Sequence, residues 1–381
     1  MINRKRMLDE FYELVQITCS TRAERQVGDI VKKKLAELHM EVSEDDTGSK
    51  IGGNCGNILG FLEGSTAEAP RLLLTAHLDC VEPCGGIQPV LKDGIITSAG
   101  DTILGSDDKS GVVAILEALR LVKEQKLPHG SIQVVFTVAE EGGLNGSKNM
   151  NPALLQADFG YALDSGGSPG EIINMAPGQN KLDITVYGKK AHAGVAPEEG
   201  INAIVLAGKA LAVIKDGRID PETTANIGSI TGGVATNIVP DKVEIQAEAR
   251  SRNPEKLAAQ TEHMRKVFEE TVKAAGGKAE VKVSKEYDSF VLAETAPVVQ
   301  LARQAAESLG LKPVIKATGG GSDANYFNSY GIPTVVLGTG MSKVHTTDEY
   351  IKEEDLYNTA ELTLAIIKTA GQIKKCGVED L

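Results

Sequence analysis

The chain has 381 residues, which is too long for one ordinary hydrophobic core and suits two domains, because cores usually stop growing at about 250–300 residues. Its 40 Lys and Arg residues against 52 Asp and Glu residues leave a net charge of −12, which argues against nucleic acid or an anionic membrane as the main partner. Hydrophobic residues at 41% and charged residues at 24% exclude a disordered chain.

Helix and strand signals alternate along the first part of the chain. A capping box at Thr21–Glu24 predicts a helix that runs to about His39. Apolar runs and a helical period then predict strands at 57–62 and 71–79, a helix at 110–125, and strands at 131–139, 159–163 and 172–175. This rhythm predicts an α/β fold, with a mixed, mostly parallel sheet covered by helices on both faces.

The pattern changes near Pro177. The following segments predict the order β-α-β-β-α-β, which is typical of a ferredoxin-like α+β domain: 182–187, 202–214, 225–231, 242–249, 254–275 and 279–284. After Leu292 the first rhythm resumes, with a helix at 296–309, strands at 314–317 and 334–337, and a helix at 353–370. We therefore predict one discontinuous α/β domain, residues 1–177 and 293–381, interrupted by an inserted domain, residues 178–292.

Acids and histidines stand at the predicted strand ends, where α/β proteins place their sites. They are His77 and Asp79, Asp107 in the run Gly105–Gly111, Glu140 and Glu141, Asp164, and His345. Each motif alone fits a structural role: Asp and Ser are ordinary helix caps, and adjacent glutamates are usually solvated. Because His77 and Asp79 are two residues apart on a strand, they share a face, as a metal ligand and the acid that orients it would.

Taken together, these residues form a nitrogen and oxygen ligand set that suits zinc, with cobalt or manganese as substitutes. A carboxylate shared by two metals would create a two-metal site for hydrolysis. Such chemistry also needs a general base that is not itself a ligand, and a glutamate next to a ligand glutamate supplies one.

The order of these motifs resembles that of the di-zinc peptidases that include carboxypeptidase G, succinyl-diaminopimelate desuccinylase and the aminoacylases, and it is most similar to their peptidase T-like branch. The resemblance covers essentially the whole chain and implies two zinc ions. By motif, Asp107 resembles the bridging ligand, His77 and Asp164 the other ligands of one zinc, and Glu141 and His345 those of the second. Glu140 resembles the general base, and Asp79 the acid that orients the ring of His77.

The resemblance also implies roles outside the ligand set. In the family the inserted domain is a lid and a dimerisation domain, so a homodimer is expected. His192 resembles a lid histidine that reaches the partner subunit's active site and supports the oxyanion. Four further residues resemble parts of the substrate pocket: Asn237, Arg250, Gly320 and Ser322.

The substrate stays open between several classes. The last motif, His345-Thr-Thr-Asp-Glu, has a form that is widespread in the family but differs from that of tripeptide aminopeptidases. We expect an exopeptidase acting on short peptides, of aminopeptidase or tripeptidase type. The alternatives are an N-acyl amino acid amidohydrolase, a carboxypeptidase, or a peptide-binding protein without catalysis. A nucleotide enzyme is disfavoured, because the chain has no phosphate-binding glycine loop of the usual spacing.

The cysteines and the first residues favour a cytoplasmic location. The five Cys residues follow no disulfide or zinc pattern, which favours free thiols in a reducing compartment. The first fifteen residues contain no apolar signal-peptide stretch, and no apolar run approaches the roughly 20 residues needed to span a bilayer. We expect a soluble protein with no nucleic-acid or membrane partner.

Overall fold

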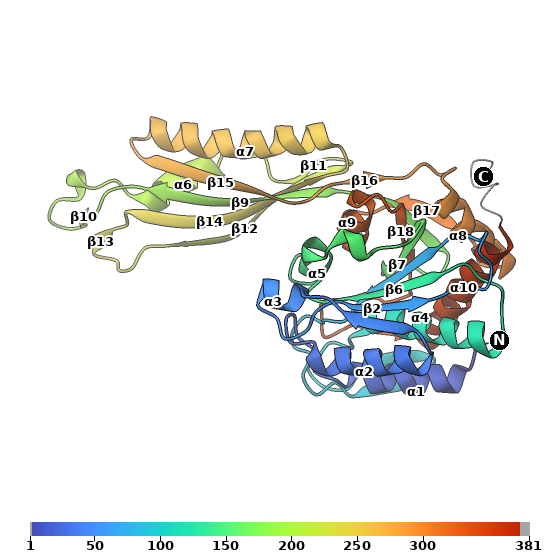
Figure 1. Ribbon diagram of the computed structural model, residues 1–381. Coiled ribbons are helices and arrows are strands. Elements are labelled where there is room, and N and C mark those ends of the chain that lie inside the picture. The colour runs from blue at the N-terminus through green and yellow to red at the C-terminus, as the bar shows by residue number, and fades with distance from the viewer. Residues whose placement is uncertain (1, 374–381) are drawn as a thin grey trace. The chain divides into compact units, whose positions relative to one another are not determined.

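The computed structural model describes residues 2–373, which divide into two compact units. Unit 1 contains the described residues up to Met175, together with Leu292–Ala317 and the residues from Ser322 onward. Unit 2 contains Ala176–Val291 and Thr318–Gly321. Figure 1 shows the elements of both units.

A mixed sheet forms the centre of unit 1, with its strands in the order β1-β2-β6-β3-β7-β18-β8 and with β17 also paired to β8. The strands are β1 (Glu41–Glu44), β2 (Ile58–Leu62), β3 (Leu72–His77), β6 (Ile132–Thr137), β7 (Phe159–Ser165), β8 (Glu171–Ala176), β17 (Val314–Ala317) and β18 (Thr334–Gly338). The four central strands β6, β3, β7 and β18 are parallel to one another. A small separate sheet contains β4 (Pro89–Lys92), β5 (Ile95–Ser98) and β19 (Tyr350–Lys352).

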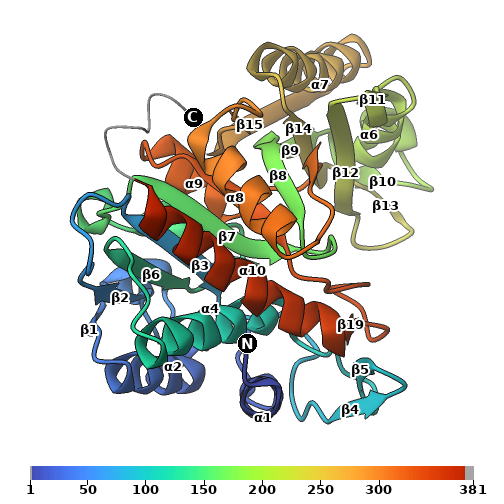
Figure 2. The ribbon, with the colours of Figure 1, turned by 90° about the vertical axis from the view of Figure 1, so that its right-hand side faces the viewer.

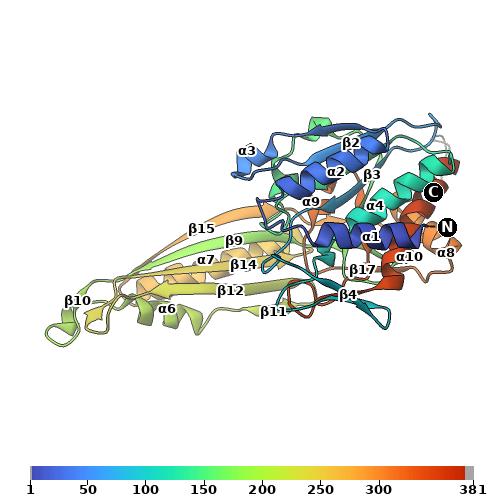
Figure 3. The ribbon, with the colours of Figure 1, turned by 90° about the horizontal axis from the view of Figure 1, so that it is seen from below.

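Helices cover both faces of the central sheet, as its apolar strands require. Leu72 and Leu74 of β3 face the larger apolar cluster, whereas Leu73 between them faces a smaller one with Met150 and Phe327. The helices that contribute to the larger cluster are α1 (Arg4–Val15), α2 (Arg25–Glu37), α4 (Ser106–Glu124), α8 (Pro297–Ser308) and α10 (Glu353–Gln372). Figures 2 and 3 show α4 and α10 side by side in this layer.

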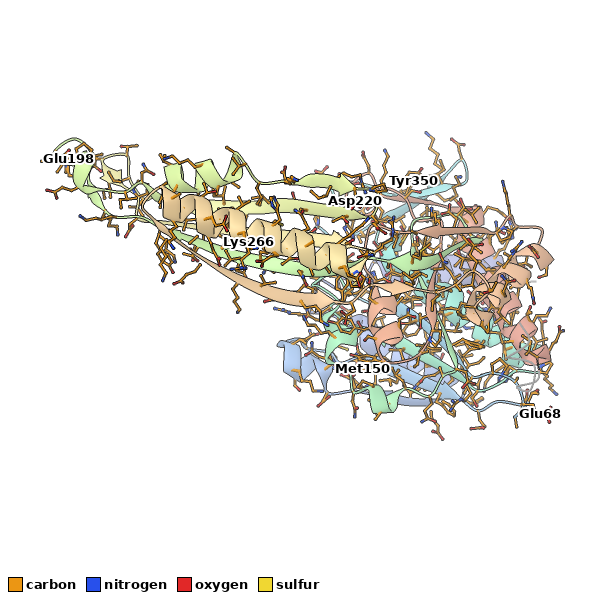
Figure 4. The ribbon with its side chains drawn as sticks, turned by 90° about the horizontal axis from the view of Figure 1, so that it is seen from above. Glu68, Met150, Glu198, Asp220, Lys266 and Tyr350 are labelled. Carbon is orange, nitrogen blue, oxygen red and sulfur yellow. The ribbon has the colours of Figure 1, made fainter. Side chains whose placement is uncertain are left out.

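The opposite face carries short helices. They are α3 (Thr47–Ile51), α5 (Asn145–Asn149), the 3₁₀ turn η1 (Pro152–Leu154) and α9 (Asp323–Ser329). Phe327 of α9 and Met150, which caps α5 and is labelled in Figure 4, pack on this face. Side chains along β3 point to alternate faces of the sheet, so His77 points away from the side of Leu74 and Ala76. It therefore faces the side that carries α9.

Unit 2 is an antiparallel sheet with two helices packed on one face. Its main strands are β9 (Gly178–Tyr187), β11 (Gly217–Asp220), β12 (Thr223–Gly232), β14 (Lys242–Ser251) and β15 (Lys278–Tyr287), and its short strands are β10 (Ala191–His192), β13 (Ile238–Val239) and β16 (Phe290–Val291). The sheet order is β11-β12-β14-β9-β15. Its helices are α6 (Ala203–Leu211) and α7 (Pro254–Ala274). The 3₁₀ turn η2 (Pro197–Glu199) lies between β10 and α6 in the chain.

Alternation along β9 and β14 explains why only one face of this sheet is covered. Leu182, Ile184 and Val186 are buried under the helices, whereas Asp183 and the other residues between them lie on the open face. Lys266, labelled in Figure 4, lies on the exposed side of α7. Without β11, the strand order is that of a ferredoxin-like domain.

The predicted fold class is confirmed, and the main elements lie within a few residues of their predicted bounds. The predicted capping box at Thr21–Glu24 is wrong. Glu24 is the N-cap of α2 but makes no capping bond, and the Thr21 hydroxyl donates to Asp79 instead. Among the described residues, no helix is both long and apolar enough to cross a membrane.

Candidate metal centre

Four neighbouring parallel strands deliver most of the predicted site residues to one edge of the sheet. β3 ends at His77, and β7 carries Asp164 as its second-last residue. Glu140 and Glu141 follow the end of β6, and His345 follows β18. Carboxyl ends of adjacent parallel strands meet at one edge, so residues far apart in the sequence converge here.

One group of possible ligands is formed by His77, Asp107 and Asp164. His77 Nε2 lies 2.9 Å from Asp107 Oδ1 and 3.9 Å from Asp164 Oδ1. All three offer a ligand atom within 4.8 Å of the other two. His77 is 2% exposed, so its ring is held in place by the surrounding protein.

A second group is formed by Asp107, Glu141 and His345. His345 Nε2 lies 2.8 Å from Glu141 Oε1 and 3.3 Å from Asp107 Oδ2. Asp107 therefore belongs to both groups and turns one carboxylate oxygen towards each histidine. That arrangement is what a carboxylate bridging two cations requires.

Asp79 connects the end of β3 to the two glutamates. Its carboxylate accepts hydrogen bonds from the backbone N–H groups of Glu140 at 3.0 Å and Glu141 at 3.2 Å. The nearest partner of His77 Nδ1 is the backbone carbonyl of Asp79 at 3.0 Å, with a carboxylate oxygen at 3.5 Å. Asp79 can therefore orient the ring of His77 and also fix the backbone of both glutamates.

Two buried side chains that we did not predict to be site residues, Asn57 and Glu24, hold the turn after β6. Asn57 Oδ1 accepts from Val138 N–H, and Asn57 Nδ2 donates to the carbonyl of Gly146. Glu24 Oε1 accepts from the N–H of Ala139, whose φ of +50° is strained for a residue with a Cβ. No local sequence signal identifies these contacts, since they join residues 81 to 115 positions apart.

Asp323 closes the turn from the other side. Its two oxygens accept from the hydroxyls of Thr137, the last residue of β6, and Ser147 in α5, both at 2.5 Å. The glutamates therefore stand on a segment whose two ends are tied to the first residue of α9. Asp323 directly follows Ser322, which we predicted to be part of the substrate pocket, and its carboxylate makes these contacts.

Glu349 fixes the start of α4. Its buried carboxylate accepts from the N–H groups of Leu104, Gly105 and Asp107 and from the Ser106 hydroxyl, at 2.6–3.1 Å. Glu349 is the last residue of the motif His345-Thr-Thr-Asp-Glu, so the segment that carries one histidine also orients Asp107.

The pKa values follow from burial and from the crowding of like charges. Burial, and then the neighbouring Asp164, raise the pKa of Glu140 well above its usual range. Burial opposes ionisation of Asp107 as well, but hydrogen bonds from His345 and His77 lower its pKa overall. Hydrogen bonds to Asp107 and Glu141 raise the pKa of His345 to about 10. The cluster therefore concentrates negative charge that attracts positive partners.

The donor set fits divalent cations. Glu141 Oε1 is buried and lies 2.8 Å from His345 Nε2, so this oxygen and this nitrogen are placed to share one cation. Two imidazole nitrogens and three carboxylates within reach suit zinc, with its N and O ligands. Glu140 also lies within a possible ligand group with His77 and Glu141, whereas Glu141 belongs in addition to the group with Asp107 and His345.

The predicted oxyanion residue His192 and the four predicted substrate residues occupy several places. His192 in β10 and Asn237 just before β13 come together, because the carbonyl of Asn237 accepts from Ala193 N–H. Arg250 lies on β14, away from that pair, and its guanidinium donates twice to Glu248. Gly320 is an exposed residue of unit 2, whereas Ser322 is buried in unit 1 as the N-cap of α9. Their contacts with substrate stay predictions.

Comparisons with known proteins found a matching family and several similar chains. The model of Peptidase family M20/M25/M40 matches residues 73–369. Aminopeptidase PepT from Bacillus cereus is 47% identical, with a TM-score of 0.90, over 97% of this chain and 100% of that one. A tripeptidase from Staphylococcus aureus is 44% identical, with a TM-score of 0.94, over 98% of this chain and 100% of that one. The uncharacterized protein YqjE of Bacillus subtilis is 45% identical over 98% of this chain and its own full length.

Proposed function

The chain belongs to peptidase family M20/M25/M40, and on that basis we propose that its acid and histidine cluster binds two zinc ions and cleaves short peptides from their amino end. The broader function is a metal-dependent exopeptidase, a hydrolase of peptide bonds. The observation that carries the proposal is Asp107, which turns one oxygen to each of two histidine-containing groups.

Each metal has a proposed set of ligands. His77 and Asp164 would hold one zinc, Glu141 and His345 would hold the second, and Asp107 would be shared by both. When bound, the two ions polarise the substrate carbonyl and lower the pKa of the attacking water towards about 7. Cobalt or manganese accepts the same N and O ligands and can substitute.

Glu140 is the proposed general base. Its carboxylate accepts the proton of the attacking water and passes it to the leaving amine, so it must stay outside the coordination shell. Asp79 supports this role because it accepts from the N–H groups of both Glu140 and Glu141. The general base and its neighbouring ligand are therefore positioned by one carboxylate.

The remaining parts of the proposal concern substrate and assembly. We assign His192 to catalysis, as the residue that supports the oxyanion. We assign Asn237, Arg250, Gly320 and Ser322 to substrate binding, and residues 178–292 to a lid through which a homodimer forms. The resemblance of these motifs to the family supports these assignments. A cytoplasmic location is supported by Cys19, Cys55, Cys80 and Cys84, which are all free thiols.

A substrate panel tests the proposal. The metal-loaded protein is incubated with a free tripeptide, the same peptide with its amine acetylated, and an N-acyl amino acid, and the products are identified by mass. An aminopeptidase releases the first residue of the free tripeptide and leaves the acetylated peptide intact. Faster cleavage of the N-acyl amino acid would instead assign an amidohydrolase, and no cleavage at all with zinc bound would indicate a binding protein.

A further inference from the structure

Two buried thiols lie in contact beside the metal centre. Cys19 and Cys80 are 1% and 2% exposed, and their Sγ atoms are 3.8 Å apart. The N–H of Cys80 donates to the carbonyl of Cys19 at 3.0 Å, and the neighbouring Ser20 pairs with Cys80 as an isolated parallel bridge. The backbone hydrogen bond and the sulfur contact hold the two cysteines side by side. The sulfurs are therefore close enough to bond once their two segments shift towards each other.

A buried lysine completes this thiol cluster. Lys109 is fully buried, and its Nζ lies 2.6 Å from the carbonyl of Leu78 and 3.2 Å from Cys80 Sγ. A buried ammonium group needs an anionic neighbour, which a thiolate of the pair provides. Thiolates are the form of cysteine that reacts with oxidants.

We propose that Cys19 and Cys80 are a peroxide-sensitive site whose oxidation to a disulfide reversibly lowers the activity of the enzyme. One sulfur of the pair attacks hydrogen peroxide, an S–O bond forms, the O–O bond breaks, and the departing hydroxide takes up a proton to become water. The other sulfur then attacks the oxidised one, the S–S bond forms, and the hydroxyl leaves as a second water with the proton of the attacking thiol. Two thiols and one peroxide thus yield one disulfide and two waters.

Bonded contacts connect this pair to the site. Thr21, two residues after Cys19, donates its hydroxyl to Asp79 Oδ2 at 2.8 Å, and Asp79 precedes Cys80. Asp79 in turn accepts from the N–H groups of Glu140 and Glu141. Closing the sulfurs from 3.8 Å to the roughly 2.05 Å of a disulfide moves both segments that hold Asp79. Oxidation should therefore displace the general base and its neighbouring ligand, and remove the sulfur partner of Lys109.

Mass analysis after oxidation tests the chemistry without relying on the assigned activity. The test uses metal-loaded protein in which Cys376→Ser removes the one cysteine outside the described residues. This protein is treated with hydrogen peroxide, its remaining thiols are alkylated under denaturing conditions, and its peptides are mapped. We expect a linked peptide joining Cys19 to Cys80, two mass units lighter than the sum of its parts. Peptide cleavage should fall several-fold in parallel and recover with dithiothreitol.

Three single variants in the same background provide the controls. Cys19→Ala and Cys80→Ala should each resist inactivation, so that either one is informative if the other fails to fold. Cys55→Ala, which removes a buried thiol whose sulfur donates only to the carbonyl of Gly56, should remain as sensitive as the parent. Absence of the Cys19–Cys80 peptide, or a linkage through Cys84, whose Sγ lies 3.5 Å from Ser20 Oγ, would overturn the assignment. A disulfide that forms without loss of activity would overturn its coupling to the site.

Discussion

Glu140 and Glu141 are neighbours of the same type, and only their surroundings separate their roles. Glu141 lies 2.8 Å from His345, whereas Glu140 is the more deeply buried and has a raised pKa. The sequence supported these assignments only through the resemblance of its motifs, because two adjacent glutamates after a strand are otherwise unremarkable. Their positions depend on Asn57, Glu24 and Asp323, whose contacts span too much of the chain to be recognised from local patterns.

Replacing Glu140 with Gln separates catalysis from metal binding. Gln cannot accept the proton of the attacking water, so turnover should fall by about 10²–10⁴-fold, the usual contribution of a general base. Two metals per chain should still bind, because Glu140 is not a proposed ligand. Glu141→Gln is the matched comparison and should lose metal as well as activity. Elemental analysis with turnover measurements checks both, and near-normal activity of Glu140→Gln would contradict the assignment.

Glu24 predicts a pH dependence of stability. Burial, and then the nearby Asp79, raise its pKa from an ordinary value of 4.5 to about 7. Between these values the folded protein holds more protons at Glu24 than the unfolded chain, so the free energy of unfolding falls as pH rises and levels off above pH 7. The shift corresponds to about 3 kcal/mol.

Glu24→Gln removes that ionisation while keeping the shape of the side chain. Relative to the wild type, the free energy of unfolding of the variant should therefore rise between pH 4.5 and 7 by up to about 3 kcal/mol. Urea unfolding of both proteins at several pH values measures this difference. A difference that does not change with pH would show that Glu24 ionises as it does in the unfolded chain.

At the scale of elements, periodicity predicted most of the long helices and strands because their buried faces repeat over many residues, although the twelve-residue helix α1 was not predicted. It missed short elements such as α5 and α9, each of seven residues or fewer, although both border the site. The capping box failed for a related reason. Thr21 and Glu24 bond instead to Asp79 and Ala139, 58 and 115 residues away, and tertiary contacts outweighed the local motif.

The start of α4 offers a test at this scale. Glu349 accepts four hydrogen bonds from residues 104–107 and so positions Asp107. Glu349→Gln puts an N–H donor where acceptors are needed, and metal affinity should weaken by about 10–100-fold, as with other residues that orient ligands. Glu354→Gln is the control, because its salt bridge to Arg4 is exposed. Competition with a chelator measures both affinities, and equal affinities would mean that Asp107 is positioned without Glu349.

For the whole molecule, the negative charge is unevenly distributed. Residues 178–292 contain 16 Lys and Arg and 16 Asp and Glu, whereas the rest of the chain contains 24 against 36. The entire surplus of 12 thus belongs to the α/β part, which includes the cluster around Asp107. Two divalent cations would add four positive charges there. The overall acidity, which first argued only against nucleic acid, therefore includes a local concentration of charge suited to metal.

Metal dependence of turnover is the most direct test of the two-metal assignment. Metal-free protein is titrated with zinc, and hydrolysis of a free tripeptide is followed at each step. We expect no turnover without metal and maximal turnover at two equivalents of zinc per chain. The variant Asp107→Asn should not reach this maximal turnover, because both metals share the Asp107 carboxylate. Full turnover in the metal-free protein, or a maximum at one equivalent, would contradict the two-metal site.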